Sequence, residues 1–117
     1  MFSLQSEMAI ALLDLFNSRV DSSKQNGFMA KVSDDINLYL EWERDKSNKK
    51  LYHFYVSFTS GKFGIRGRER IQTWNLEHKT IKSLNFAIQN LNRTQAELTV
   101  DNWANVLTNG IFNKEDK

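Results

Sequence analysis

The strongest constraint on the fold is the alternation of apolar and polar residues within the segment 36–74. Across residues 36–43, apolar side chains alternate with polar or amphipathic ones, and a second alternating run covers residues 51–58. Because successive side chains of a strand point to opposite faces, this pattern is typical of strands that bury one face in an antiparallel sheet. We expect three or four consecutive strands, joined by a polar loop at residues 44–50 and a tight hairpin at residues 59–61.

Helical periodicity is present on both sides of that segment. Apolar residues recur every three or four positions across residues 3–19, which predicts an amphipathic helix with Ser3 as its N-cap. Residues 28–32 could form a short strand before the main sheet. After the sheet, we expect a second helix that Asn75 caps and a third helix that begins at Thr99.

These elements predict one α+β domain over residues 1–112 and a frayed polar tail at residues 113–117. The expected architecture is an antiparallel meander of four to five strands with an N-terminal helix and two C-terminal helices. A chain of 117 residues with 40% hydrophobic residues can bury one core, and it has no apolar run long enough to cross a membrane. The absence of cysteine and of a secretory signal favours a cytoplasmic location.

Charge is distributed unevenly along the chain, although the formal net charge is only +2. Residues 1–43 carry three Lys/Arg against seven Asp/Glu, residues 44–82 carry ten against three, and residues 83–117 carry three against four. The three segments therefore have charges of −4, +7 and −1. A basic sheet between acidic flanks predicts a dipolar surface that attracts an acidic partner, either a nucleic acid or an acidic patch on a protein. The alternative is that the charges are spread around the fold and serve solubility.

The sequence offers little to support a cofactor, a metal or a catalytic centre. The only histidines are His53 and His78, and no H-E-x-x-H motif is present, so we expect no metal site. Gly61, Gly64 and Gly67 lie in a hairpin context and are not followed by the Gly-Lys-Ser/Thr of a phosphate-binding loop. No G-x-S-x-G motif of a serine hydrolase occurs. We therefore expect no cofactor and no enzymatic activity.

The polar face of the predicted sheet is the main candidate for a binding site. The residues expected there are Tyr39, Glu41, His53, Tyr55, Lys62, Arg66 and Arg68. Tyrosine and arginine are enriched at the energetic hot spots of protein interfaces, and they also suit base stacking and phosphate contacts in single-stranded nucleic acid. Gly64 and Gly67 predict a bulge or a close backbone approach, which leaves the strand register beyond Gly67 open. The alternative is that another element covers the tyrosines.

A second candidate patch lies on the helix expected after the sheet. Phe86 projects opposite the apolar seam of that helix, on the side that carries Lys79, Lys82 and Arg93. An aromatic ring among cations could contact a partner, or it could be buried under the C-terminal segment.

A metal-independent ribonuclease is the enzymatic alternative. His53 would act as general acid or base with Glu41 as its partner. Arg66 or Arg68 would stabilise the phosphate. The competing interpretation is that the histidine and the glutamate are only neighbours on a solvated sheet face.

Part of the sheet sequence resembles a known family. The residues that carry the resemblance are Tyr39-Leu40-Glu41-Trp42, Ser47-Asn48-Lys49 with Tyr52 and Phe54, and Phe63-Gly64-Ile65-Arg66-Gly67. Their order is similar to the strand, glycine-arginine turn and helix of WGR domains, which are nucleic-acid-associated modules. The resemblance covers about half of the chain, with Phe63-Gly64-Ile65 in place of the defining Trp-Gly-Arg and an additional N-terminal helix. It implies binding of RNA or single-stranded DNA.

The function that these observations favour is non-enzymatic protein binding. We expect a small inhibitor of a larger enzyme, with a nuclease as the leading target, of the toxin-immunity, anti-restriction or anti-CRISPR type. Such proteins act by surface complementarity and need no catalytic motif. The absence of proline together with abundant Asn and Lys indicates an AT-rich coding sequence such as bacterial or phage mobile DNA. Direct binding of RNA or single-stranded DNA is the alternative.

Overall fold

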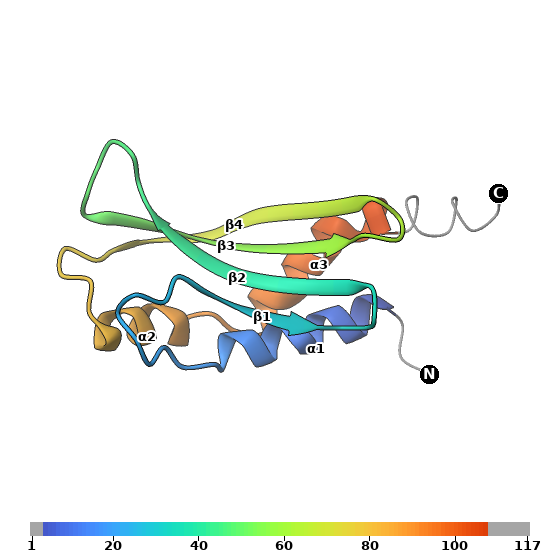
Figure 1. Cartoon of the computed structure of the whole chain (residues 1–117), viewed down its shortest axis with the longest axis horizontal. Helices are drawn as coiled ribbons and strands as arrows, with labels where there is room; N and C mark the ends of the chain where they lie inside the picture. The colour runs from blue at the N-terminus through green and yellow to red at the C-terminus, as the bar shows by residue number, and fades with distance from the viewer. Residues whose placement is uncertain (1–3, 108–117) are drawn as a thin grey trace.

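The computed structural model describes residues 4–107, which form three helices and four strands. Their order is α1 (Leu4–Phe16), β1 (Gly27–Lys31), β2 (Ile36–Arg44), β3 (Leu51–Ser60), β4 (Ile65–Asn75), α2 (Ile81–Gln89) and α3 (Arg93–Leu107) (Figure 1). The predicted α+β class, with one helix before the sheet and two after it, is confirmed. The predicted cap Ser3 and the predicted tail at residues 113–117 lie outside the described residues.

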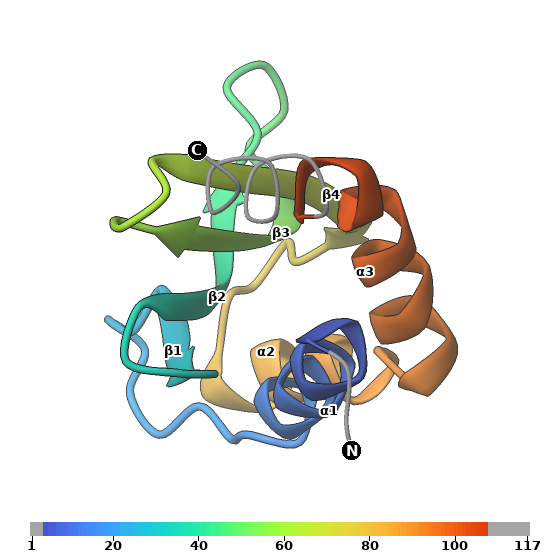
Figure 2. The same ribbon diagram turned by 90° about the vertical axis from the view of Figure 1, so that its right-hand side faces the viewer.

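The sheet is an antiparallel meander with the strand order β1-β2-β3-β4. The described helices lie on one side of it, with α1 against β1 and β2 and with α3 against β4 (Figure 2). Fully buried side chains on this inner face include Leu38, Leu40, Phe54, Val56 and Phe58. They occupy alternate positions of β2 and β3, as the two-residue period predicts. The opposite side of the sheet is called the outer face below.

All three described helices contribute buried side chains to the core, α2 with Leu84, Ala87 and Ile88. α1 buries Met8, Leu12, Leu15 and Phe16, and α3 buries Ala96, Thr99, Val100, Trp103 and Leu107. These side chains hold α1 and α3 against the sheet because burial of large apolar side chains is the main favourable contribution to folding. No helix within residues 4–107 is long and apolar enough to cross a membrane.

The pairing of β3 with β4 contains a bulge at Ile71. Phe54 pairs with Gln72, whereas Tyr55 pairs with Arg70, so Ile71 is the extra residue on β4. The bulge therefore does not lie at Gly64 or Gly67, where the sequence predicted one. Because it follows Arg70, the alternation of β4 is undisturbed from Ile65 to Arg70.

The sequence also predicted a close backbone approach as the alternative to a bulge, and the structure shows one at Gly67. A Cβ atom added at Gly67 would lie 2.6 Å from Cε1 of Phe58 and 2.8 Å from Nε1 of Trp103. The rings of Phe58 and Trp103 are themselves in contact, with centroids 4.8 Å apart. Glycine at this position thus lets α3 place its tryptophan directly on β4.

Two predicted helix starts are wrong. β4 continues through Asn75, which pairs with Leu51, and α2 is capped by Thr80 instead. The Thr80 hydroxyl accepts from the backbone N–H of Ser83, and the Ser83 hydroxyl accepts from the backbone N–H of Thr80. α3 begins at Arg93 and not at Thr99, which lies buried inside the helix.

Candidate functional site

The outer face of the sheet carries two rows of side chains that cross all four strands. The strand pairing aligns Met29, Tyr39, Ser57 and Arg68 in one row and Gly27, Glu41, Tyr55 and Arg70 in the next. The helices within residues 4–107 lie on the other side of the sheet (Figure 2). Tyr39 and Tyr55 are partly exposed and the arginines are exposed, so no described helix or strand fully covers the tyrosines.

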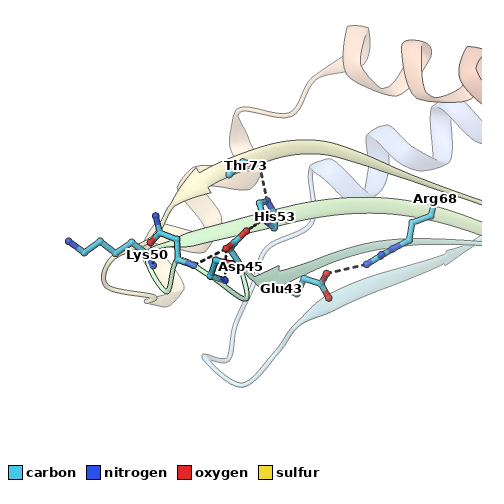
Figure 3. A network of polar contacts seen from close by, with 8 residues as sticks. Glu43, Asp45, Lys50, His53, Arg68 and Thr73 are labelled. Atoms are coloured by element: carbon cyan, nitrogen blue, oxygen red, sulfur yellow. Dashed lines mark hydrogen bonds and ion pairs between the residues drawn. The ribbon is translucent and has the colours of Figure 1, made fainter.

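Arg68 contacts both an aromatic ring and a carboxylate on this face. Its guanidinium carbon lies 3.7 Å from the centroid of the Tyr55 ring, and Nη2 lies 3.7 Å from Oε1 of Glu43 (Figure 3). Directly opposite Arg68 is Ser57, whose small side chain leaves room for the guanidinium to reach Tyr55 diagonally. The side chain of Arg68 is still 54% exposed, so these contacts position it without removing it from solvent.

Two outer-face residues were missed by the sequence prediction. Arg70 lies opposite Tyr55 and continues the outer-face alternation of Arg66 and Arg68, because the bulge at Ile71 comes only after it. Met29 is 57% exposed and lies opposite Tyr39, but the short strand β1 was not assigned to either face. The two-residue spacing of Arg66, Arg68 and Arg70 is the signal that could have included Arg70.

The predicted residues Arg66 and Lys62 lie toward the turn between β3 and β4. Arg66 is opposite Thr59 on the outer face. Lys62 lies in the turn, where its backbone N–H donates to Oδ1 of Asp35 at 2.8 Å and its ammonium group lies 5.1 Å from the centroid of the Phe63 ring. Lys62 therefore extends the basic outer face at one end without being part of the rows.

His53 occupies an outer-face position but is only 9% exposed. Its Nδ1 lies 2.8 Å from Oγ1 of Thr73, and its Nε2 lies 2.7 Å from Oδ2 of Asp45 (Figure 3). The ribonuclease hypothesis paired His53 with Glu41, but Glu41 lies opposite Tyr55 and the carboxylate beside the imidazole is that of Asp45. Both ring nitrogens have partners, a geometry that favours a structural role.

Asp45 joins this imidazole to the loop between β2 and β3. Its Oδ1 accepts from the backbone N–H groups of Ser47 and Asn48, each at 2.8 Å. The hydrogen bond with His53, followed by the two from the backbone, lowers the pKa of Asp45 to about 2. Hydrogen bonds to a carboxylate favour its charged form, so this residue remains an anion near neutral pH. The lysine-rich loop is thereby fixed to the end of the sheet.

The structure brings together only some residues of the second candidate patch. Phe86 is 59% exposed, and its ring meets that of Trp74 edge-on with centroids 5.8 Å apart. Lys79 lies at the same end of the sheet, 5.7 Å from the centroid of the Tyr52 ring, and Tyr52 pairs with Trp74. Lys82 is exposed near the start of α2, whereas Arg93 begins α3 and lines a groove against α1.

Within residues 4–107, no group of three or more His, Asp or Glu side chains is placed to hold a metal ion. The outer face is a broad surface of aromatic and charged groups. No protein-family model, curated protein or solved structure matches the chain. The resemblance to WGR domains therefore depends on the residues quoted for it alone.

Proposed function

We propose that this protein is a non-enzymatic inhibitor that binds a larger protein through the outer face of its sheet. The observation that carries the proposal is a tyrosine-arginine surface that no element of residues 4–107 covers, in which Arg68 lies on Tyr55 beside Glu43. Tyrosine, methionine and arginine are the side chains that protein interfaces favour, and the largest binding contributions come from Trp, Tyr and Arg. An ordered guanidinium also loses less conformational entropy on binding.

Two details favour a protein partner over a nucleic acid. The guanidinium of Arg68 covers one face of the Tyr55 ring, so that this face is closed to a stacking base. Glu41 and Glu43 lie exposed among the arginines, and they would repel phosphates but could pair with cations of a protein. Binding of RNA or single-stranded DNA stays the alternative because Arg66, Arg68 and Arg70 line one strand.

The area of the outer face indicates how the partner would be contacted. The strands have 5, 9, 10 and 11 residues. At about 3.4 Å per residue and a spacing of about 4.8 Å, they present a projected area of about 570 Å². A standard interface uses about 800 Å² of each partner, so neighbouring loops would contribute. The loop at residues 45–50, with Lys46, Lys49 and Lys50, projects from the sheet end in Figure 1. These lysines would extend the basic surface toward an acidic region of the partner.

The proposed partner is a larger nucleic-acid-processing enzyme, with a nuclease as the leading candidate. The proposal places the protein with toxin-immunity, anti-restriction or anti-CRISPR types of inhibitor. A wide contact surface supports it, because inhibition by coverage requires complementarity and no chemistry. The cytoplasm, where such an enzyme meets nucleic acid, is the proposed location.

Pull-down from the native host, followed by calorimetry with the recovered partner, tests this function. Arg66→Glu with Arg68→Glu should weaken binding by about tenfold or more, since a reversed charge opposes an acidic contact. The matched control is Arg19→Glu with Lys24→Glu, which reverses two exposed cations between α1 and β1. Intact binding by the outer-face variant would refute the proposed surface.

A parallel titration with labelled RNA and single-stranded DNA distinguishes the alternative. Binding to phosphates weakens steeply as salt rises, because each neutralised phosphate releases counterions. Tight, salt-sensitive retention of nucleic acid without a stoichiometric protein partner would replace the inhibitor proposal. No retention at low salt would eliminate the nucleic-acid alternative.

A further inference from the structure

A groove of about 500 Å³ runs between α1 and α3, away from the sheet. The two helices pack on each other beside the core (Figure 2). The apolar part of the groove is formed by Ala9, Ile10, Leu13 and Val100. Arg93, Glu97 and Asp101 line it from α3, so this wall carries one cation at its start and two carboxylates beyond it. The groove therefore combines an apolar strip with carboxylates along one side.

Ile10 is the exposed part of that apolar strip. It is 50% exposed, although it lies among the side chains of two packed helices. Glu7 and Asp14 are three residues before and four residues after it on α1, so both lie next to it on the helix surface. A partner that covered Ile10 would meet acidic groups on both sides.

The two carboxylates of the groove, Glu97 and Asp101, have no ion-pair partner within residues 4–107. The helix α1 contains no Lys or Arg. In contrast, Glu43 on the outer face is paired with Arg68. Glu97 and Asp101 are one helical turn apart and repel each other, which a cation between them would relieve. Arg93 lies one turn before Glu97, at the start of the helix.

We propose that this groove binds a cationic amphipathic helix of a protein partner. The apolar side chains of that helix would cover Ile10 and Val100, and its Lys or Arg side chains would meet Glu97 and Asp101. From Arg93 to Asp101 the groove extends about 12 Å along α3, which matches two to three turns of a bound helix. Helices that dock in grooves present apolar anchors at spacings of three and four residues. This surface has the opposite charge to the outer face and is independent of it.

The probe is a synthetic helical peptide with leucine on one face and lysine on the other, titrated into the full-length ¹⁵N-labelled protein. We expect shifts of amide resonances in α1 and α3. Ile10→Ser, and separately Glu97→Lys with Asp101→Lys, should each weaken binding by about tenfold. Leu98→Ser is the matched apolar control, because Leu98 is 54% exposed on α3 but does not line the groove. Asp21→Lys is the matched charge control on an exposed loop residue.

A second peptide with glutamate in place of lysine checks that charge directs the binding. Equal affinity for both peptides, shifts that fall on the outer face, or unchanged affinity in the groove variants would each overturn the proposal, as would the absence of binding. The variants alter exposed side chains, and circular dichroism verifies that each remains folded. Arg66→Glu with Arg68→Glu should leave peptide binding intact, so a failure here does not bear on the proposed inhibitor function.

Discussion

The guanidinium of Arg68 lies 3.7 Å from the centre of the Tyr55 ring although these two residues are not paired in the sheet. Tyr55 pairs with Arg70, and Arg68 pairs with Ser57, so the contact is diagonal. At exposed sites a cation-π contact contributes about 0.5–1 kcal/mol, which is enough to favour one orientation of a long side chain. The outer face therefore presents at least one cation in a fixed position.

Arg68→Lys should reduce partner binding by about tenfold while lowering the free energy of unfolding by no more than about 1 kcal/mol. Lysine keeps the charge but loses the planar group that lies on the ring and the fork of N–H donors. Calorimetry with the recovered partner and urea denaturation measure the two effects. Arg66→Lys is the control, because Arg66 is opposite Thr59 and has no ring contact within residues 4–107. Equal losses at both positions would contradict a special role for Arg68.

Gly67→Ala should destabilise the fold by about 1–3 kcal/mol, the usual cost of overpacking a core. The added methyl group would lie 2.6 Å from the Phe58 ring and 2.8 Å from the Trp103 indole, so either β4 or α3 must move. Gly61→Ala is the control, since the nearest atom there is Oδ1 of Asp35 at 3.8 Å. Urea denaturation of both variants provides the measurement, and similar stabilities would show that the α3 contact is adaptable.

Alternation predicted β2 and β3 because each of these strands buries one face, but the turn expected at residues 59–61 lies between Ser60 and Ile65. The helix starts were not predictable in the same way, since Asn75, Thr80, Asn92 and Thr99 can all serve as caps. The cap that is used depends on how far β4 remains paired with β3, and that pairing continues to Asn75. Asn92 then accepts from the backbone N–H of Gln95 at the start of α3.

The candidate site was predictable where it depends on alternation and not where it depends on loops or packing. Tyr39, Tyr55, Arg66 and Arg68 lie on the predicted face. The carboxylate beside His53 comes from a loop residue whose position relative to the sheet no periodicity reveals. The groove between α1 and α3 likewise depends on how two helices meet. The periodicity of a sequence predicts which face of one helix or strand a residue occupies. It does not predict which residues of different elements come into contact, because that depends on the tertiary structure.

Acid should release the loop at residues 45–50. The pKa of Asp45 is lowered from 3.8 to about 2, first by the hydrogen bond with His53 and then by the backbone N–H groups of Asn48 and Ser47. A depressed pKa in the folded state means that the stabilisation is fully present above pH 3.8 and is lost as the pH falls toward 2. Carboxyl resonances followed by NMR should give a midpoint for Asp45 near 2.

Asp45→Asn provides the stability test of the same linkage. The variant should be less stable than the parent protein at pH 5, and the difference should shrink as the pH falls below 3.8. Asp101→Asn is the control, because the Asp101 side chain has neither a hydrogen bond nor an ion pair within residues 4–107. A difference that stays constant between pH 5 and pH 2 would show that the carboxylate does not anchor the loop.

Asn85 is a buried amide on α2 that satisfies both backbone groups of Val20. Its Oδ1 accepts from the Val20 N–H at 2.7 Å and its Nδ2 donates to the Val20 carbonyl at 3.0 Å, with the side chain 7% exposed. Asn85→Leu would leave a donor and an acceptor buried without partners, at a cost of about 1–3 kcal/mol for each. The free energy of unfolding should fall accordingly, and the Val20 amide should exchange with deuterium faster. Asn90→Ala, which removes an exposed amide from the end of the same helix, should change stability by no more than about 0.5 kcal/mol. If Asn85→Leu were as stable as the parent protein, the segment after α1 would be held to α2 by apolar packing of Val20 alone.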